Sequence, residues 1–379
     1  MADPRATGAA AEGAPPVEPG AVGLVAIGRN EGERLRACLA SARGAAQRLV
    51  YVDSGSDDDS VAIAEGLGVR VVHLDTAQGF TAARARNAGV DALLDGAEGE
   101  ATLPEFIQFV DGDCELVPGW IETARARLAA RPALAAVAGR RRERFPDATP
   151  FNRLCDMEWN TPVGPARAVG GDAMYRAQAF RAVGGFDPLF ICGEEPELCF
   201  RLRAQGWEIE RLDAEMTLHD AAMTRWSQWR KRNERSGWAF AEGAATYGAT
   251  PERYNLAQRR SLVVWGALAP AAIAALLALS AGLWIAGSAW GWAAAAAATL
   301  GLAAYAAMAR RVAGYRMRTF GDPAPHARLY GALVMLGKPF QALGAWRFVR
   351  ARARGERGRI IEYKSAGTAG APGAGRTEP

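Results

Sequence analysis

Two aspartates that leave an apolar run together are the residues best placed to do chemistry. Asp111 and Asp113 follow the run Phe106–Val110, with Gly112 between them. Two carboxylates this close repel each other unless a cation lies between them, and hard oxygen ligands suit Mg²⁺ or Mn²⁺ shared with phosphate oxygens. Gly112 lets the backbone turn sharply and approach a ligand. The pattern therefore predicts a divalent-metal site.

Two other polar loops follow apolar runs earlier in the chain. Asn30 and Glu31 come after Val22–Ile27, and Asp53 comes after Leu49–Val52. Such side chains could bind the N–H groups of a nucleotide base and the hydroxyls of a ribose. Taken alone, each is better explained as a turn or helix-cap residue.

The segments that must position these loops alternate between strand and helix. Apolar runs predict strands over Val22–Ile27, Leu49–Val52, Val69–Leu74 and Phe106–Val110. Helical patterns cover Gly32–Gly44, Ser60–Gly66, Ala82–Asp95 and Gly119–Ala130. This alternation predicts an α/β fold with a mixed, mostly parallel sheet, which we assign to residues 21–255. Ligands of such sheets bind beyond the carboxyl ends of the strands, where the polar loops fall.

Several motifs together resemble those of one enzyme family. The loops Ile27–Glu31, Val52–Ser60 and Val110–Asp113, in this order, resemble the family-2 glycosyltransferases, which have the GT-A nucleotide-sugar-binding fold. Further segments resemble motifs of the same family: Arg86–Gly89, Gly184–Asp187, Gly193–Arg203 and Gly206-Trp207. The resemblance covers about residues 21–250, and the combination is far more specific than any single motif.

The resemblance implies roles in binding the nucleotide and the metal. Asp53 would contact the nucleotide base, and Arg86 would contact the base or the diphosphate. Asp111 would face the ribose or the metal, and Asp113 would bind the metal. His219, one of three histidines, would be a further metal or diphosphate contact, although a loop histidine satisfied by its neighbours explains it nearly as well.

The same resemblance assigns the catalytic base to the acidic pair Glu194-Glu195. Its second member, Glu195, would take the proton of the acceptor hydroxyl, and the start of a helix at Pro196 would keep the carboxylate ionised. Glu194 could instead cap that helix. Gly171-Asp172 would form the floor under the donor sugar, or else a tight turn before a strand. Arg232 lies in a basic segment that would close on the diphosphate or rest on a membrane.

The implied activity is an inverting, metal-dependent transfer of a single sugar to a hydroxyl acceptor. The donor would be a nucleotide-diphosphate sugar, a UDP-sugar by family habit, with guanine and thymine donors left open. Gln228–Arg232 lacks the Gln-x-x-Arg-Trp motif of processive relatives, which favours one sugar per encounter. One alternative is a catalytically inactive, membrane-tethered nucleotide-sugar-binding scaffold. Another is a nucleotidyltransferase, although Gly28–Gly32 is too acidic and too poor in glycine for one.

An uncharged segment near the C-terminus predicts a membrane anchor. Residues 261–309 carry no charge, which exceeds the roughly 20 residues of one span and suits a helical hairpin that breaks near Gly287-Ser288. Arginines flank both ends, so both ends and the catalytic domain are expected in the cytoplasm, at the inner or plasma membrane. Residues 310–363 are expected to form a cytoplasmic, basic, interfacial helical segment interrupted at Pro339, and a third span over 329–349 stays open.

Composition sets the remaining expectations. The net charge of +4 does not favour nucleic acid as a partner. The five cysteines include no CxxC pair, which favours reduced thiols over disulfides or a zinc site. Residues 1–20 and 364–379 are rich in Ala, Gly and Pro, and we expect a disordered leader and tail. A membrane anchor suggests a lipid-linked glycan or a glycolipid as the acceptor, as in the synthesis of cell-envelope polysaccharides.

Overall fold

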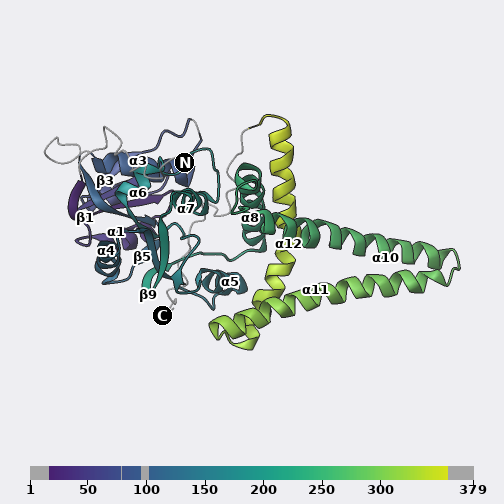
Figure 1. The fold of residues 1–379 in the computed structure, drawn as a ribbon. Helices are drawn as coiled ribbons and strands as arrows, with labels where there is room; N and C mark the ends of the chain where they lie inside the picture. The colour runs from purple at the N-terminus through teal and green to yellow at the C-terminus, as the bar shows by residue number, and fades with distance from the viewer. Residues whose placement is uncertain (1–16, 78, 95–101, 357–379) are drawn as a thin grey trace, which may run out of the picture. The chain divides into compact units, whose positions relative to one another are not determined.

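A computed structural model describes residues 17–77, 79–94 and 102–356 (Figure 1). The chain divides into two compact units, one made of Met1–Arg144 with Asp156–Asp220 and the other of Phe145–Cys155 with Ala221–Pro379. The predicted tail and residues 1–16 of the predicted leader lie outside the described residues.

The first unit is built on a sheet that has nine strands within the described residues, in the order β3-β2-β1-β4-β8-β6-β9-β5, with β7 paired to β9. The strands are β1 Val17–Gly28, β2 Arg48–Asp53, β3 Arg70–His73, β4 Leu103–Asp111, β5 Cys114–Leu116, β6 Leu134–Glu143, β7 Gly164–Pro165, β8 Ala173–Arg176 and β9 Glu208–His219. The pairings β1–β2, β2–β3, β1–β4 and β6–β9 are parallel, whereas β8 runs antiparallel between β4 and β6. The sheet is therefore mixed and mostly parallel, as predicted.

The helices of this part of the chain are α1 Glu33–Ala42, α2 Ser60–Gly66, α3 Ala82–Leu94, α4 Trp120–Ala130, α5 Pro150–Trp159, α6 Ala177–Ala182 and α7 Glu194–Ala204. All four predicted strands and all four predicted helices are present, with ends that differ by a few residues. One boundary was wrong. Val17–Gly20 belongs to β1 and not to a disordered leader, because Gly20 N–H donates to Glu105 at 2.6 Å and Val17 pairs with Leu103.

Close contact between α3 and the sheet fixes the position of the Arg86–Gly89 motif. A Cβ atom on Gly89 would lie 2.2 Å from Cγ1 of Val25 on β1, so only glycine allows this approach. Val25 is completely buried, and Arg86 lies one helical turn before Gly89. The motif thus sets the distance between α3 and β1, and with it the position of the Arg86 side chain.

The second unit is helical. Its helices are α8 Trp226–Tyr247, α9 Leu256–Ser261, the π-helical segment η1 Leu262–Leu268, α10 Ala269–Ile285, α11 Trp290–Phe320 and α12 Ala324–Ala353. Two stretches, Leu256–Ile285 and Trp290–Phe320, are long and apolar enough to cross a membrane, with mean hydropathies of 2.3 and 1.4. In Figure 1, α10 and α11 lie side by side and project away from α8 and α12. The chain turns between them at 286–289, where the break was predicted.

The segment after the hairpin differs from its prediction. Helix α11 continues past residue 309 to Phe320, and α12 runs without interruption through Pro339. Proline has no N–H to offer the carbonyl of Met335 one turn earlier. The hydroxyl of Tyr305 on α11 lies 3.4 Å from that carbonyl and makes its shorter hydrogen bond to the Trp265 carbonyl.

Candidate active site

The metal-binding residues predicted from the sequence meet at one edge of the sheet. Strand β4 ends at Asp111, and the chain turns through Gly112 and Asp113 into β5. Because β5 pairs with β9 in a register that sets Cys114 opposite His219, the imidazole lies beside the second aspartate. The distance from His219 Nε2 to Asp113 Oδ2 is 3.1 Å.

Arg86 connects the two acidic motifs. Its guanidinium donates to Asp111 Oδ1 at 2.9 Å and to Glu194 Oε1 at 3.0 Å, and lies 3.1 Å from Glu195 Oε1. Its side chain is only 2% exposed. Burial by itself would lower the pKa of Arg86, but the carboxylates of Glu195, Asp111 and Glu194 raise the pKa above its ordinary value. Arg86 was predicted to contact the nucleotide, whereas the structure sets it against three carboxylates of the protein itself.

The acidic pair occupies the first two positions of α7, not the two positions before it. Burial raises the pKa of Glu195 to about 7, and the negative charge of Glu194 adds to this effect while Arg86 opposes it. The Glu195 side chain is 18% exposed and that of Glu194 only 4%. Glu195 is therefore the member of the pair that a substrate can reach, and a carboxylate with such a pKa suits a general base near neutral pH.

Gly171 provides backbone between these groups. A Cβ atom at this position would lie 2.4 Å from Arg86 Nη2 and 3.1 Å from both Asp111 Oδ2 and Glu195 Oε1. A side chain would therefore fill the space that separates the metal motif from the acidic pair. The floor under the donor sugar that was assigned to Gly171 stays a prediction.

Asp172 was predicted to lie with Gly171 in the floor under the donor sugar, but its carboxylate is bound by other residues of the protein. Its side chain is completely buried, accepts hydrogen bonds from Asp111 N–H at 3.1 Å and Thr217 Oγ1 at 2.8 Å, and pairs with Arg141 at 2.7 Å. These bonds hold the end of β4 and leave Asp172 out of reach of a sugar hydroxyl. Its neighbour in the sequence, Gly171, is the residue that lies within the site.

Sequence reasoning missed Arg141 and Trp159. Arg141, near the end of β6, pairs with Asp172 and lies 3.3 Å from Asp111 Oδ2. The guanidinium also lies over the ring of Trp159, which packs edge-on against His219 with ring centroids 4.5 Å apart. The available signal was a run of arginines at the end of an apolar stretch, the same pattern that identified the aspartates.

The loops after β1 and β2 are tied to each other. Asp53 is 3% exposed and accepts from Gly55 N–H and Ser56 N–H, each at 3.0 Å. Asn30 accepts from Asp57 N–H at 2.9 Å, and Asn30 N–H donates to Ser56 Oγ at 2.9 Å. Asp53 thus shapes its own loop, so the expected contact between its carboxylate and a base would have to displace these donors.

The two remaining predicted residues are Glu31, whose N–H joins the contacts between the loops by donating to Ser60 Oγ at 3.1 Å, and Arg232. Glu31 forms an ion pair with Arg34 at 2.8 Å, and its side chain is 10% exposed. Arg232 lies on α8 in the second unit.

Comparison with known proteins identifies the domain. A family model described as glycosyl transferase family 2 matches residues 25–181. This segment is a family 2 glycosyltransferase domain. The chain is similar to a solved mannosyltransferase from Pyrobaculum calidifontis in complex with GDP-Man and Mn²⁺. The TM-score is 0.52 and the identity 16%, over 85% of this chain and 86% of that one. At this identity the likeness shows the fold alone, and that fold is GT-A.

Two curated relatives match parts of the chain. A pre-mycofactocin glycosyltransferase of Mycobacterium tuberculosis is 29% identical over 208 residues, which are 51% of this chain and 41% of the relative. A TPR repeat-containing protein of Synechococcus elongatus is 35% identical over 142 residues, 37% of this chain and 32% of the relative. The chain thus spans less than half the length of these relatives.

The glycosyltransferase domain offers ligands that fit a divalent cation. Asp113 contributes carboxylate oxygen and His219 contributes imidazole nitrogen, and adjacent ligands of an octahedral ion with bonds of about 2.1 Å lie about 3 Å apart, close to the 3.1 Å found here. Nδ1 of His219 is buried and has no hydrogen-bond partner among the described residues. Burial, and then the charge of Arg141, lower the pKa of His219 to about 4, so the imidazole is neutral, as a ligand must be.

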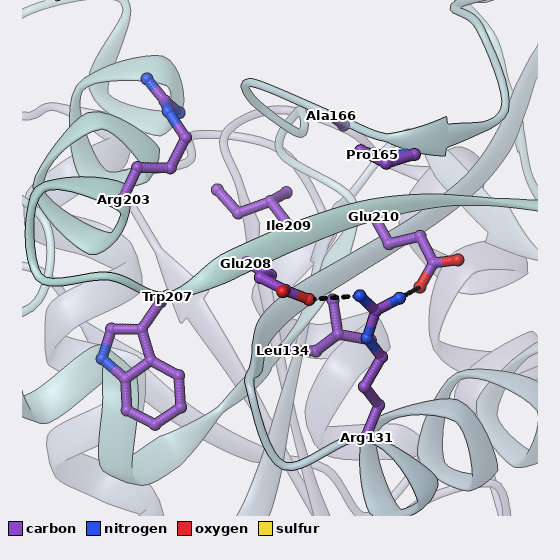
Figure 2. A pocket seen from close by; sticks show the side chains of 9 residues that line it. All are labelled: Arg131, Leu134, Pro165, Ala166, Arg203, Trp207, Glu208, Ile209 and Glu210. Carbon is purple, nitrogen blue, oxygen red and sulfur yellow. Dashed lines mark ion pairs between the residues drawn. The ribbon is translucent and has the colours of Figure 1, made fainter.

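The domain also has a pocket (Figure 2) at the end of the sheet opposite to the one that carries Arg141 and His219. It has a volume of about 270 Å³ and is lined by Arg131, Leu134 and Glu208, among others. Leu134 and Glu208 begin β6 and β9, whereas Arg141 and His219 lie towards the other ends of these strands, roughly 20–35 Å away at about 3.3 Å per residue. Arg131 pairs with Glu208 at 2.6 Å, so the polar lining is largely neutralised.

Proposed function

We propose that this protein is an inverting glycosyltransferase that moves one sugar from a nucleotide-diphosphate sugar to a hydroxyl acceptor. The observation that carries the proposal is the convergence of Asp111 and the accessible carboxylate of Glu195 around one glycine, Gly171, at the carboxyl end of β4, where Asp113 follows Asp111 by two residues. Such an arrangement offers a base for the acceptor beside a site for the leaving diphosphate.

In this proposal Glu195 takes the proton of the acceptor hydroxyl. The acceptor oxygen forms a bond to the anomeric carbon while the bond from that carbon to the phosphate oxygen breaks, and the nucleoside diphosphate leaves. Attack opposite to the leaving group inverts the configuration of that carbon. Arg86 holds Glu195 at 3.1 Å and thereby orients the carboxylate.

The metal-binding residues in the proposal are Asp113 and His219, with Asp111 at the solvent side. A divalent cation such as Mn²⁺ or Mg²⁺ would neutralise charge that develops on the leaving diphosphate. Asp111 is 29% exposed, so it can face the ribose or the diphosphate while its other contacts persist. The donor would be a nucleotide sugar, with a UDP-sugar as the first candidate.

We further propose that the acceptor is linked to a lipid. The support is the pair of apolar stretches, of which only 11% is buried within the protein. Helices that leave this much apolar surface uncovered need a lipid environment. Arg259 and Arg260 before the hairpin, with Arg310 and Arg311 on its other side, support an orientation in which both ends and the catalytic domain face the cytoplasm.

The test is release of nucleoside diphosphate by detergent-solubilised protein from a panel of nucleotide sugars, with Mn²⁺ or Mg²⁺ and with or without a membrane lipid extract. We expect release with one donor, stimulated by the extract, and loss of at least about 100-fold in Glu195→Gln. Glu122→Gln is a matched control, because Glu122 lies in the first turn of α4 and is exposed. Nuclear magnetic resonance of the product reports whether an α-linked donor gives a β-linked product.

Two outcomes would contradict the proposal. Full activity in Glu195→Gln would remove the assigned base. Nucleotide-sugar binding without release from any donor, in the presence of the extract, would favour a catalytically inactive binding scaffold.

A further inference from the structure

Cys114 lies at the metal-binding edge of the sheet, although the proposed function gives it no role. It is the first residue of β5 and directly follows Asp113. Its Sγ atom lies 3.6 Å from Asp113 Oδ1, and one ligand atom from each of Asp113, Cys114 and His219 lies within 4.8 Å of the others. All three side chains are buried. A thiol, an imidazole and a carboxylate therefore share one small space.

Two of the distances between these atoms, one to each oxygen of Asp113, are close to those between ligands of a tetrahedral ion. With Zn–S bonds of about 2.3 Å and Zn–N or Zn–O bonds of about 2.0 Å, adjacent ligand atoms lie roughly 3.3–3.6 Å apart. The structure has 3.6 Å between the sulfur and Asp113 Oδ1 and 3.1 Å between His219 Nε2 and Asp113 Oδ2. The nitrogen of His219 that lies beside Asp113 is Nε2, while the buried Nδ1 has no hydrogen-bond partner among the described residues.

A second group, made of Asp111, Cys114 and Asp172, also brings ligand atoms together. There the guanidinium of Arg141 already lies 2.7 Å from Asp172 and 3.3 Å from Asp111. Since a cation occupies that side of the sulfur, the position for a metal ion lies on the side of Asp113 and His219.

We propose that Cys114 makes this edge a site for thiophilic divalent ions, so that Zn²⁺ and Cd²⁺ bind through Asp113, Cys114 and His219 and exclude Mn²⁺ or Mg²⁺. Thiolate sulfur is a soft ligand that selects Zn²⁺ over Mg²⁺ and Mn²⁺, which prefer oxygen. On binding, the S–H bond breaks, the sulfur bonds to the metal, and the proton passes to solvent, so the affinity for zinc rises with pH. The inference rests on the proposed function only in naming the ions that zinc would displace.

The test is the spectroscopy of the full-length protein in detergent. Titration with Cd²⁺ should produce the ultraviolet charge-transfer absorption of a cadmium–thiolate bond, at one ion per chain. X-ray absorption of the zinc-loaded protein should show one sulfur at about 2.3 Å. Cys114→Ser should abolish the cadmium band and weaken zinc binding by about 100-fold or more, while the affinity for Mn²⁺, followed by electron paramagnetic resonance, changes by less than about threefold.

Cys38→Ser is the matched control, because Cys38 is also completely buried and its thiol donates to the Asp111 carbonyl at 3.6 Å, outside the cluster. It should keep the cadmium band. A zinc-loaded wild-type protein with only nitrogen and oxygen ligands would overturn the proposal, and that measurement does not depend on whether a variant folds. Persistence of the band in Cys114→Ser would overturn it as well. Neither readout needs turnover, so an intact thiolate signal without sugar transfer would refute the proposed function alone.

Discussion

Replacement of Arg86 by methionine tests whether one guanidinium holds the active site together. The side chain is 2% exposed and contacts the carboxylates of Asp111, Glu194 and Glu195 at 2.9–3.1 Å. Methionine is also long and unbranched, so Arg86→Met removes the charge and the donors while it keeps much of the packing. Glu194 and Glu195 would then lie next to each other with no counter-charge from Arg86.

The expected cost follows from the burial of the partners. Removal of one member of a buried ion pair destabilises a protein by about 3–5 kcal/mol, because it leaves an uncompensated charge. Glu194, at 4% exposure, should account for most of this cost, whereas Asp111 is 29% exposed and keeps Arg141 at 3.3 Å. In a domain of about 200 residues, 1 kcal/mol lowers Tm by roughly 2–4 °C, so we expect a fall of about 6–20 °C.

The assay is thermal and urea unfolding at pH 8 and pH 5, with a double variant. Protonation of the carboxyls at acid pH relieves the uncompensated charge, so the loss of stability should be smaller at pH 5. Arg86→Met combined with Glu194→Gln should recover about 1–2 kcal/mol, since it removes one buried charge. Arg127→Met is the control, because Arg127 is 38% exposed and solvent screens its pair with Glu210, so this substitution should change stability little. A loss below about 1 kcal/mol at pH 8, or no recovery in the double variant, would refute this reasoning.

Three further substitutions test other contacts. The pKa of Glu195 is raised to about 7 from an ordinary 4.5, so the fold favours the neutral carboxyl, and this contribution to stability is present below pH 4.5 and lost as the pH rises through 7. In metal-free protein, Glu195→Gln should therefore raise the free energy of unfolding by about 2–4 kcal/mol at pH 8 and by much less at pH 4. Equal effects of the substitution on urea unfolding at the two pH values would contradict the pKa shift. Gly171→Ala should lower kcat/KM by about 10–100-fold with little change in Tm. Gly170→Ala is the control, because its Cβ would meet nothing within 4 Å, and it should have no effect on kcat/KM. Equal values of kcat/KM in the two variants would show that Gly171 is not needed as a floor under the donor sugar. Gly89→Ala should destabilise the domain by about 1–3 kcal/mol in thermal unfolding because its Cβ would lie 2.2 Å from Val25, and an unchanged Tm would mean that α3 moves freely.

The first half of the catalytic sheet could be predicted because its signals are local. Buried parallel strands give continuous apolar runs, and polar loops follow each of them, so β1, β2 and β4 and the residues Asp111 and Asp113 at their ends were found from the sequence. Strands β6 and β9 were not predicted. In β9 charged residues alternate with apolar ones, and β6 ends in Arg140–Arg142, so neither has the composition of a buried strand along its full length.

The partners of charged side chains could not be predicted, because they depend on contacts between distant parts of the chain. Arg86 is 108 residues from Glu194 and 25 from Asp111, and Arg141 is 30 from Asp111. A sequence motif shows that such residues belong to the site, but it does not show which atoms their side chains contact. For this reason the sequence placed Arg86 on the nucleotide and Asp172 on the sugar, whereas both hold other side chains of the site in place.

The balance of charge in the site leads to a final prediction. In the described structure the carboxylates of Asp111, Asp172, Glu194 and Glu195 face the guanidinium groups of Arg86 and Arg141, and Asp113 lies beside Cys114 and His219. Burial, and then the negative charges of Glu194 and Asp111, raise the pKa of Glu195 to about 7 and would hold the base protonated below that pH. A divalent cation adds positive charge nearby, and positive charge lowers the pKa of a carboxyl.

The pH dependence of activity should therefore change with the concentration of metal. At saturating Mn²⁺ we expect the acidic limb of the kcat/KM profile to lie below pH 7, and at limiting Mn²⁺ to move to higher pH, since kcat/KM reports the free enzyme's base. Asp113→Asn, which weakens metal binding, should move the limb in the same direction as metal limitation. If the acidic limb instead keeps one position at all concentrations of Mn²⁺, the charge of the metal does not affect the pKa of the base. That result would refute an electrostatic interaction between a metal at Asp113 and the carboxyl of Glu195.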